Sequence, residues 1–169
     1  DCVGYPADFS TKTNACYARN LRLIVEPQEA EIQLGITNSP SAPLSLCTQF
    51  PISLDYISAQ ISDAIQPTLS FELPGGATAL AIDSITIEHP QGSGNTQTVP
   101  YTILGSVVTV QLSSHTLIAA NGGLLGTQNA ATAAQRIASI TLYLKLNCTL
   151  PSGIDFDFTP QATSPCGDP

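Results

Sequence analysis

The chain has 169 residues, enough for one domain with a sizeable core, and a net charge of −8 with only five Lys and Arg residues. So few basic side chains argue against nucleic acid and anionic membrane surfaces as partners, because there is no basic footprint to bind phosphates. No apolar run reaches the ~18 residues of a membrane span, so we expect no membrane insertion. Charged residues make up 11%, and hydroxyl and amide side chains take their place, as is typical of extracellular β proteins.

The N-terminal part begins with turn formers and little periodicity, which predicts an irregular lead-in over residues 1–20. Residues 21–26 (LRLIVE) form a short strand candidate that Pro27 ends. Residues 30–37 then alternate apolar and polar side chains, which predicts a strand with one face on a core.

The middle of the chain contains three further strand candidates, at residues 52–59, 68–73 and 80–88. In the last of these the apolar positions change parity. One extra residue near Asp83 and Ser84 would restore a common face, so the pattern predicts a β-bulge there.

A hairpin is predicted from two strands, 99–103 and 108–112, around a turn at Gly105. Pro100 lies inside the first strand and indicates a sheet edge, because proline cannot donate to a ladder. Residues 127–136 (TQNAATAAQR) are the only plausible helix, with Thr127 as its N-cap, and a loop is the alternative for this short segment.

The longest uninterrupted alternation is ITLYLKLNCTL, residues 140–150. Its length and the strand candidates available on both sides predict a central strand. Pro151 and Gly153 end it, and alternation resumes in GIDFDFTP, residues 153–160.

These elements predict an all-β fold: an antiparallel, immunoglobulin-like β-sandwich of about 7–9 strands with at most one short helix. A barrel is the alternative architecture. The sandwich domain is expected over residues 21–160, followed by a linker or tail over 161–169.

Five cysteines carry no zinc pattern, because no C-x-x-C pair occurs and the chain has only two histidines. Disulfides are the favoured interpretation for an extracellular chain. We predict a local Cys2–Cys16 bridge and a core Cys47–Cys148 bridge, which leaves Cys166 unpaired or bound to a neighbouring module.

Catalytic and metal patterns are weak. The G-x-S-x-G motif is absent, and His89 and His115 are interpreted as loop histidines. Asp155 and Asp157 would share one face of a strand, which makes them a weak Ca²⁺ candidate, although solvated aspartates at a sheet edge are the favoured interpretation. The sequence therefore predicts no enzyme, no metal and no cofactor.

Two modification signals occur. Asn147 lies in Asn-Cys-Thr, which fits the N-x-[ST] acceptor pattern with an unusual central cysteine. Ser84 lies in Asp-Ser-Ile, which resembles the O-glycosylation site of secreted Bacteroidetes proteins. Both residues are predicted glycosylation acceptors.

The order of features resembles a known kind of module. A cysteine precedes the alternating LCTQFPISLDYISAQI, a strand ends in Leu-Pro-Gly-Gly at residues 73–76, and ITLYLKLNCTL is followed by GIDFDFTP. This arrangement, over residues 47–163, is similar to the conserved-repeat modules of large secreted bacterial surface proteins such as the gliding adhesins of Bacteroidetes. The usual Asn-Thr-Gly signature is not obvious. The resemblance implies an immunoglobulin-like stalk or adhesive unit without catalytic residues.

The expected function is therefore a structural or adhesive module of an extracellular, cell-surface protein in a tandem array. Its expected partners are neighbouring modules, identical subunits, or surface glycans and proteins. The alternative is a filament subunit that assembles by strand exchange or strand addition through a terminal segment. A third hypothesis, a small secreted enzyme or inhibitor, would need a cleft with converging titratable groups.

Overall fold

The computed structural model describes residues 31–40, 44, 47–58, 64–74, 80–126, 132–147 and 155–163. Within these ranges the chain forms ten β-strands, one α-helix and two 3-10 helices. The predicted lead-in over residues 1–20 and the strand candidate at 21–26 lie outside the described residues.

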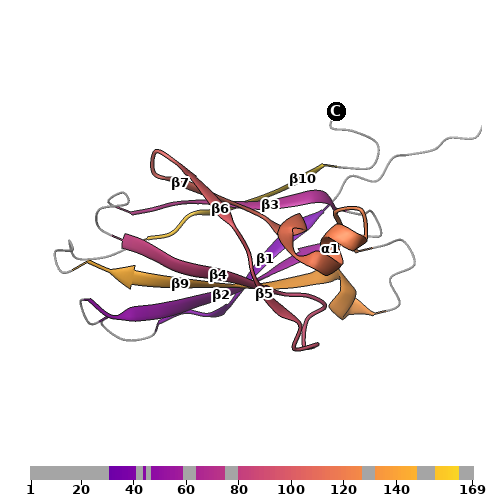
Figure 1. The fold of residues 1–169 in the computed structure, drawn as a ribbon, viewed down its shortest axis with the longest axis horizontal. Helices are drawn as coiled ribbons and strands as arrows, with labels where there is room; N and C mark the ends of the chain where they lie inside the picture. Colours follow the sequence, from indigo (N-terminus) through magenta and orange to yellow (C-terminus); the bar gives the residue numbers. More distant parts are fainter. Residues whose placement is uncertain are drawn as a thin grey trace, which may run out of the picture.

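The strands form two antiparallel sheets that lie face to face as separate layers (Figure 1). The first sheet has the order β1 (Ile32–Asn38), β2 (Gln49–Ser58), β9 (Ile137–Leu146), β4 (Leu80–Glu88) and β5 (Thr96–Thr98). The second has the order β10 (Phe158–Thr163), β3 (Ala64–Glu72), β7 (Val107–Gln111) and β6 (Tyr101–Leu104), and β8 (Leu124–Leu125) pairs with β3. The architecture is the predicted β-sandwich and not the alternative barrel.

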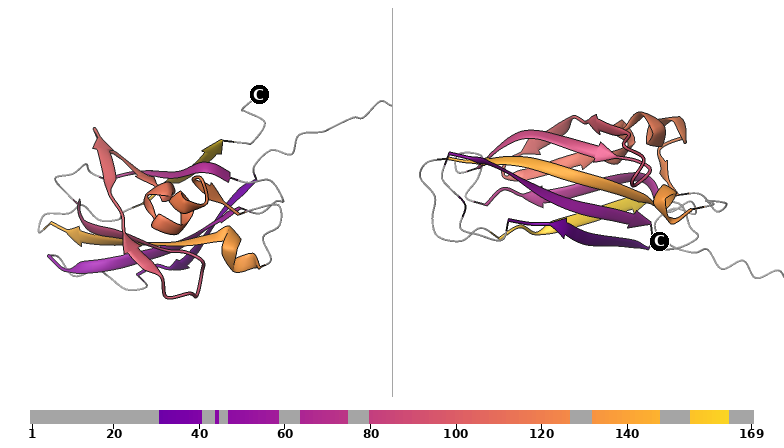
Figure 2. Two further views of the ribbon diagram at one scale, coloured as in Figure 1. Left: turned by 45° about the vertical axis from the view of Figure 1, so that its right-hand side comes forward. Right: turned by 90° about the horizontal axis from the view of Figure 1, so that it is seen from below.

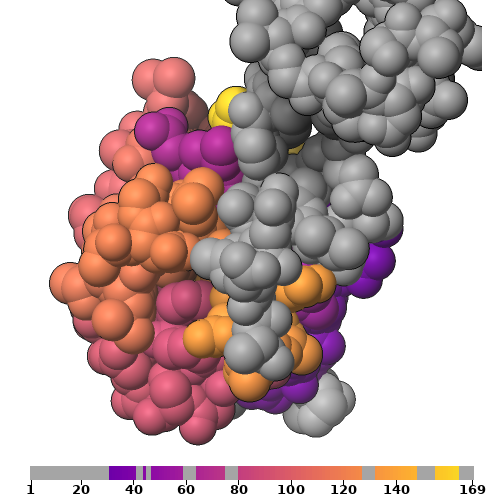
Figure 3. All heavy atoms as spheres, turned by 90° about the vertical axis from the view of Figure 1, so that its right-hand side faces the viewer, coloured from indigo at the N-terminus to yellow at the C-terminus, as the bar shows by residue number. Residues whose placement is uncertain are grey.

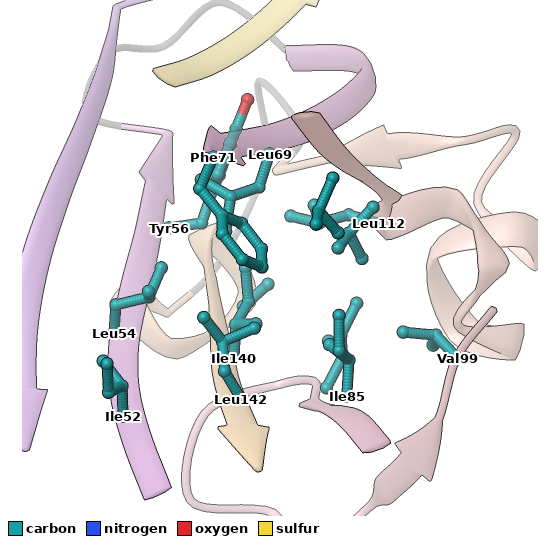
Figure 4. Packing of buried hydrophobic residues seen from close by; sticks show 14 of the residues in the cluster. Ile52, Leu54, Tyr56, Leu69, Phe71, Ile85, Val99, Leu112, Ile140 and Leu142 are labelled. Atoms are coloured by element: carbon teal, nitrogen blue, oxygen red, sulfur yellow. The ribbon is translucent and has the colours of Figure 1, made fainter. Parts of the chain in front are cut away.

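The core lies between the two inner faces, as the period of two requires. Ile52 pairs with Leu142 and Leu54 with Ile140 across β2 and β9, and all four side chains are buried. Side chains from β3, β4 and β7 complete the same cluster (Figure 4). Burying each such side chain contributes about 1.5–3 kcal/mol, so this layer is the main source of stability.

The prediction of a central strand is confirmed, because β9 lies between β2 and β4 in the middle of its sheet. Its bounds differ from the predicted 140–150: the strand begins at Ile137 and ends at Leu146. The predicted bulge is also confirmed. The register of β4 against β9 shifts between Ile82 and Ser84, which turns Ile85 back toward the core.

The hairpin of β6 and β7 is confirmed as well, and β6 is an edge strand as Pro100 indicated. The helix prediction was wrong in position. The α-helix is α1 (Thr116–Ala120), whereas Ala133–Arg136 forms the 3-10 helix η3. A five-residue helix is too short to leave a periodic pattern, and a tertiary contact of its N-cap holds it in place.

The sandwich has two sides, which are closed differently. On one side the chain passes from β5 to β6 through Val99, whose side chain is buried and whose N–H donates to the Ile85 carbonyl at 2.9 Å. On the other side β1 and β10 are the outermost described strands of their sheets and contact each other (Figure 2). We call these the crossed side and the open side.

The sandwich also has two distinct ends. β1 begins and β10 ends at the same end, because Ile32 and the last residues of β10 line one groove. The turn between β6 and β7 lies at the opposite end (Figure 1), next to Glu72, which accepts a hydrogen bond from Ser106. We call these the terminal end and the hairpin end.

Candidate functional site

The open side contains a groove of about 570 Å³ between the edges of the two sheets. The groove is lined by Ile32 of β1, by Gln66 and Thr68 of β3, and by residues 160–163 of β10. The hydroxyl of Tyr56 reaches across the sandwich and donates to the Gln161 carbonyl at 2.7 Å (Figure 4). Burial raises the pKa of Tyr56, so this hydroxyl stays protonated and remains a donor.

An aromatic cluster lies under the same edge. Phe71 of β3 is buried, and its ring centroid lies 5.5 Å from that of Phe158 and 6.4 Å from that of Phe156. Phe156 and Phe158 stack on each other at 5.8 Å and are only half-buried. The open side therefore presents apolar surface that its own strands do not fully cover.

Two histidines meet at the terminal end, where Figure 3 shows α1 beside the loop that follows β4. His89 and His115 are both buried, and their ring centroids lie 6.0 Å apart in an edge-to-face arrangement. They are distant in sequence, and the fold brings them together because β4 ends where α1 begins. The sequence interpretation as loop histidines missed this contact, and no local signal could have revealed it.

The two histidine rings differ in the hydrogen bonds that their nitrogens make. In His115, Nε2 donates to the Asn95 carbonyl at 3.1 Å and Nδ1 accepts the Leu117 N–H at 3.3 Å, which caps α1. Both of its nitrogens are thus used in holding structure. In His89, Nδ1 donates to the Ile137 carbonyl at 3.0 Å, so Nε2 is the unprotonated nitrogen of the neutral ring.

His89 lines a small pocket of about 160 Å³ together with Pro90, Leu117, Asn121, Gly126 and Gln135. Burial lowers the pKa of His89; the bond to the Ile137 carbonyl opposes this shift and the charge of His115 adds to it. The ring is therefore a neutral hydrogen-bond acceptor, but the described residues that line the pocket supply no hydroxyl or thiol that it could activate.

A carboxylate is buried on the outer face of the first sheet. Asp55 accepts hydrogen bonds from Ser139 Oγ at 2.6 Å and from Gln91 Nε2 at 2.7 Å. Two uncharged donors satisfy the two oxygens, and they attach the loop after β4 to the sheet. This arrangement is a structural one.

The hairpin end carries exposed apolar side chains. Leu104 is 86% exposed, and Ile103 and Val107 are 44% and 42% exposed. They flank the Gly105 turn, which needs its φ of +67° and therefore favours glycine. An exposed apolar tip on a loop is typical of an interaction site.

The outer faces are rich in hydroxyls. Ser53 and Thr141 are hydrogen-bonded across β2 and β9 at 3.1 Å, and Ser70 and Thr109 across β3 and β7 at 3.2 Å. Such cross-strand pairs stabilise a sheet without charged side chains.

Of the predicted disulfide residues, Cys47 alone lies within the described ranges. It is disulfide-bonded, and its N–H donates to the Leu146 carbonyl at 3.2 Å. Cys2, Cys16, Cys148 and Cys166 lie outside the described residues. The Cys47–Cys148 pairing therefore stays a prediction, as does the Cys2–Cys16 bridge.

The predicted glycosylation acceptors are both half-buried. Ser84 follows the bulge in β4, where it lies opposite Tyr143, and Asn147 directly follows β9. Glycosylation of Ser84 and of Asn147 stays a prediction.

The weak Ca²⁺ candidate rested on one strand carrying Asp155 and Asp157, and this placement was wrong. Both residues are exposed and lie before β10, which begins at Phe158. In the described ranges, no three His, Cys, Asp or Glu side chains gather as metal ligands would. No helix there is long and apolar enough to cross a membrane.

The chain matches no protein-family model, and no curated protein is similar to it in sequence. One similar solved structure is AvmM, which catalyses macrocyclization in alchivemycin A biosynthesis: the TM-score is 0.46 and the identity 10%, over 85% of both chains. A DUF4466 family protein from Parabacteroides merdae has a TM-score of 0.42 and 12% identity, over 85% of this chain and 42% of that one.

The collagen-binding domain of the Erysipelothrix rhusiopathiae surface protein RspB has a TM-score of 0.34 and 11% identity, over 85% of this chain and 53% of that one. The chain thus spans about half the length of these last two structures.

Proposed function

We propose that the chain is a structural or adhesive, non-catalytic module of an extracellular bacterial surface protein, carried in tandem with similar modules. The observation that carries this proposal is the polarity of the sandwich. β1 begins and β10 ends at the terminal end, while the exposed apolar tip around Leu104 lies at the hairpin end. A module joined to its neighbours at one end projects the other end outward, where a partner can reach it.

The extracellular setting is supported by two features. A hydroxyl pair lies on each outer face, and Cys47 is disulfide-bonded, which is typical of oxidising compartments. The bacterial surface and the tandem array rest on the resemblance of residues 47–163 to conserved-repeat modules.

The adhesive role is tested with the full chain displayed on beads and offered immobilised glycans and extracellular-matrix proteins. Leu104→Asp is expected to abolish bead capture, because it places a charge on the apolar tip. Thr102→Asp, on an exposed position of the same strand, is the matched control and is expected to bind like the parent chain. Equal binding by both variants, or no binding by the parent, would contradict the adhesive role.

The alternative function is a filament subunit, and the outer edges of β1 and β10 favour it, because no other described strand pairs with them. Edge strands with unpaired backbone groups are templates for strand addition. Sedimentation of the purified chain over a wide concentration range separates the two functions. A monomer supports the module, whereas fibres in electron micrographs support the filament.

A further inference from the structure

At the terminal end, Nε2 of His89 has no hydrogen-bond partner among the described residues. The side chain is only 8% exposed, and its other nitrogen, Nδ1, donates to the Ile137 carbonyl. The neighbouring ring of His115 uses both of its nitrogens, in bonds to Asn95 and Leu117, so neither is available to Nε2. Buried polar groups are hydrogen-bonded in the large majority of cases, so this exception points to a partner from outside the chain.

The small pocket beside His89 is polar on one side and apolar on two others. Nδ1 of the ring is held by the backbone, so the part of the ring that lines the pocket is the part that carries Nε2. Pro90 and Leu117 supply apolar surface, and the exposed Asn121 and Gln135 lie at the mouth. The volume is about 160 Å³, and a cavity of about 150 Å³ is enough to bind benzene. The pocket therefore has room for one six-membered ring.

The chemistry of the pocket selects the kind of group that fits it. Nε2 of the neutral ring of His89 accepts, so the occupant must present an O–H or N–H group. An ammonium group would lose its hydration beside apolar walls, and a carboxylate would place its lone pairs against that of Nε2. An aliphatic hydroxyl has no broad apolar body, and an indole is larger than one ring. A phenol combines an apolar ring with a hydroxyl at its tip.

We propose that this pocket binds the tyrosine side chain of a protein partner, whose hydroxyl donates to Nε2 of His89 while its ring packs against Pro90 and Leu117. The site lies at the terminal end, away from the apolar tip around Leu104. The proposal therefore goes beyond the adhesive role of the hairpin end and does not depend on it.

The mouth of the pocket favours a peptide over a free phenol. Asn121 donates through Nδ2 to the carbonyls of Leu124 and Gly126, which leaves its Oδ1 as an acceptor. The Gln135 amide is exposed and can both donate and accept. Two side-chain amides at the mouth match the backbone amide groups on either side of a tyrosine, which a free phenol does not have.

Titration of the full chain with a matched pair of ligands, followed by nuclear magnetic resonance at pH 7.5, tests the proposal. N-acetyl-tyrosinamide and N-acetyl-phenylalaninamide differ by one hydroxyl. We expect the tyrosine derivative to bind at least about tenfold more tightly, because only its hydroxyl satisfies the buried acceptor. The ¹⁵N resonance of His89 Nε2 should shift with the tyrosine derivative and not with the phenylalanine derivative.

A third ligand, p-cresol, separates the two sources of a phenol. It has the ring and the hydroxyl of tyrosine without the peptide groups, and we expect it to bind more weakly than N-acetyl-tyrosinamide. Equal affinity of these two ligands would overturn the assignment to a protein partner in favour of a free phenol. Equal affinity of the tyrosine and phenylalanine derivatives, or binding of neither at millimolar concentration, would overturn the site itself.

Three variants locate the binding. His89→Asn keeps a donor for the Ile137 carbonyl but lacks Nε2, so it should lose the preference for the tyrosine derivative. Leu117→Ala changes an exposed wall residue and should weaken both derivatives by a similar factor. Thr132→Ala is the control: it is exposed, its side chain caps no helix, and it should bind like the parent chain. A preference that persists in His89→Asn, or an equal loss in Thr132→Ala and Leu117→Ala, would overturn the proposal.

Discussion

Inward-facing apolar side chains are buried to different extents on the two sides of the sandwich. On the crossed side the chain itself connects the sheets, and Val99 is 3% exposed. On the open side Ile36 also has an inward-facing position, yet it is 66% exposed. On the crossed side, the two residues between β5 and β6 connect the sheets and cover the core. On the open side, side chains that reach across join the two sheets, as Tyr56 does.

The largest expected effect is at the aromatic cluster of the open side. Phe71→Ala should lower the free energy of unfolding by about 3–5 kcal/mol, because it removes a buried ring that two other rings contact. Phe158→Ala, on a half-buried ring of the same cluster, should cost about half as much. Urea denaturation measures both values, and equal losses would mean that β10 covers the open side more completely than the structure shows.

The second prediction compares the two sides directly. Val99→Ala should cost about 2 kcal/mol, because it opens a cavity at the crossing. Ile36→Ala should cost less than about 1 kcal/mol, because most of that side chain is already in water. The comparison fails if the two losses in thermal or urea unfolding are the same.

A third test removes one hydroxyl from each side. Tyr56→Phe should cost about 1 kcal/mol, because it leaves the Gln161 carbonyl without its buried donor. Tyr101→Phe, on the crossed side, should cost less, because its 3.3 Å bond to the Ile82 carbonyl is longer and the residue is half-buried. A larger loss for Tyr101→Phe would show that the crossed side also relies on a side-chain bond.

The smallest expected effect is a pH dependence at the terminal end. The pKa of His89 is lower in the folded chain than its usual 6.5, so the unfolded chain binds the proton first. The stability that neutral His89 contributes is therefore complete above about pH 6.5 and is lost as pH falls through the folded pKa. Urea denaturation at pH 7.5 and 5.5 measures this loss.

The control for this effect is His89→Asn, which keeps a donor for the Ile137 carbonyl but does not titrate. It should lose less stability between the two pH values than the parent chain. Identical losses would assign the pH dependence to other groups.

Local patterns predicted much of the fold because a side-chain period of two is a property of the strand itself. The alternation in β4 even revealed the bulge at Asp83, since an extra residue changes parity in the sequence as it does in the sheet. The same patterns failed where the chain is irregular: α1 is too short for a period, and alternation at Asp155 and Asp157 continued into a segment that pairs with no strand.

The sequence by itself determined which residues can face a core, the central position of β9 and the edge position of β6. Only the tertiary structure decided which inward-facing residues are covered. Ile32 and Ile36 have the same parity, but the burial of each depends on which side chains of the opposite sheet pack against it. It also decided that His89 and His115 meet. Periodicity acts between neighbours along the chain, whereas burial and contact between distant residues depend on how the two sheets are ordered and joined.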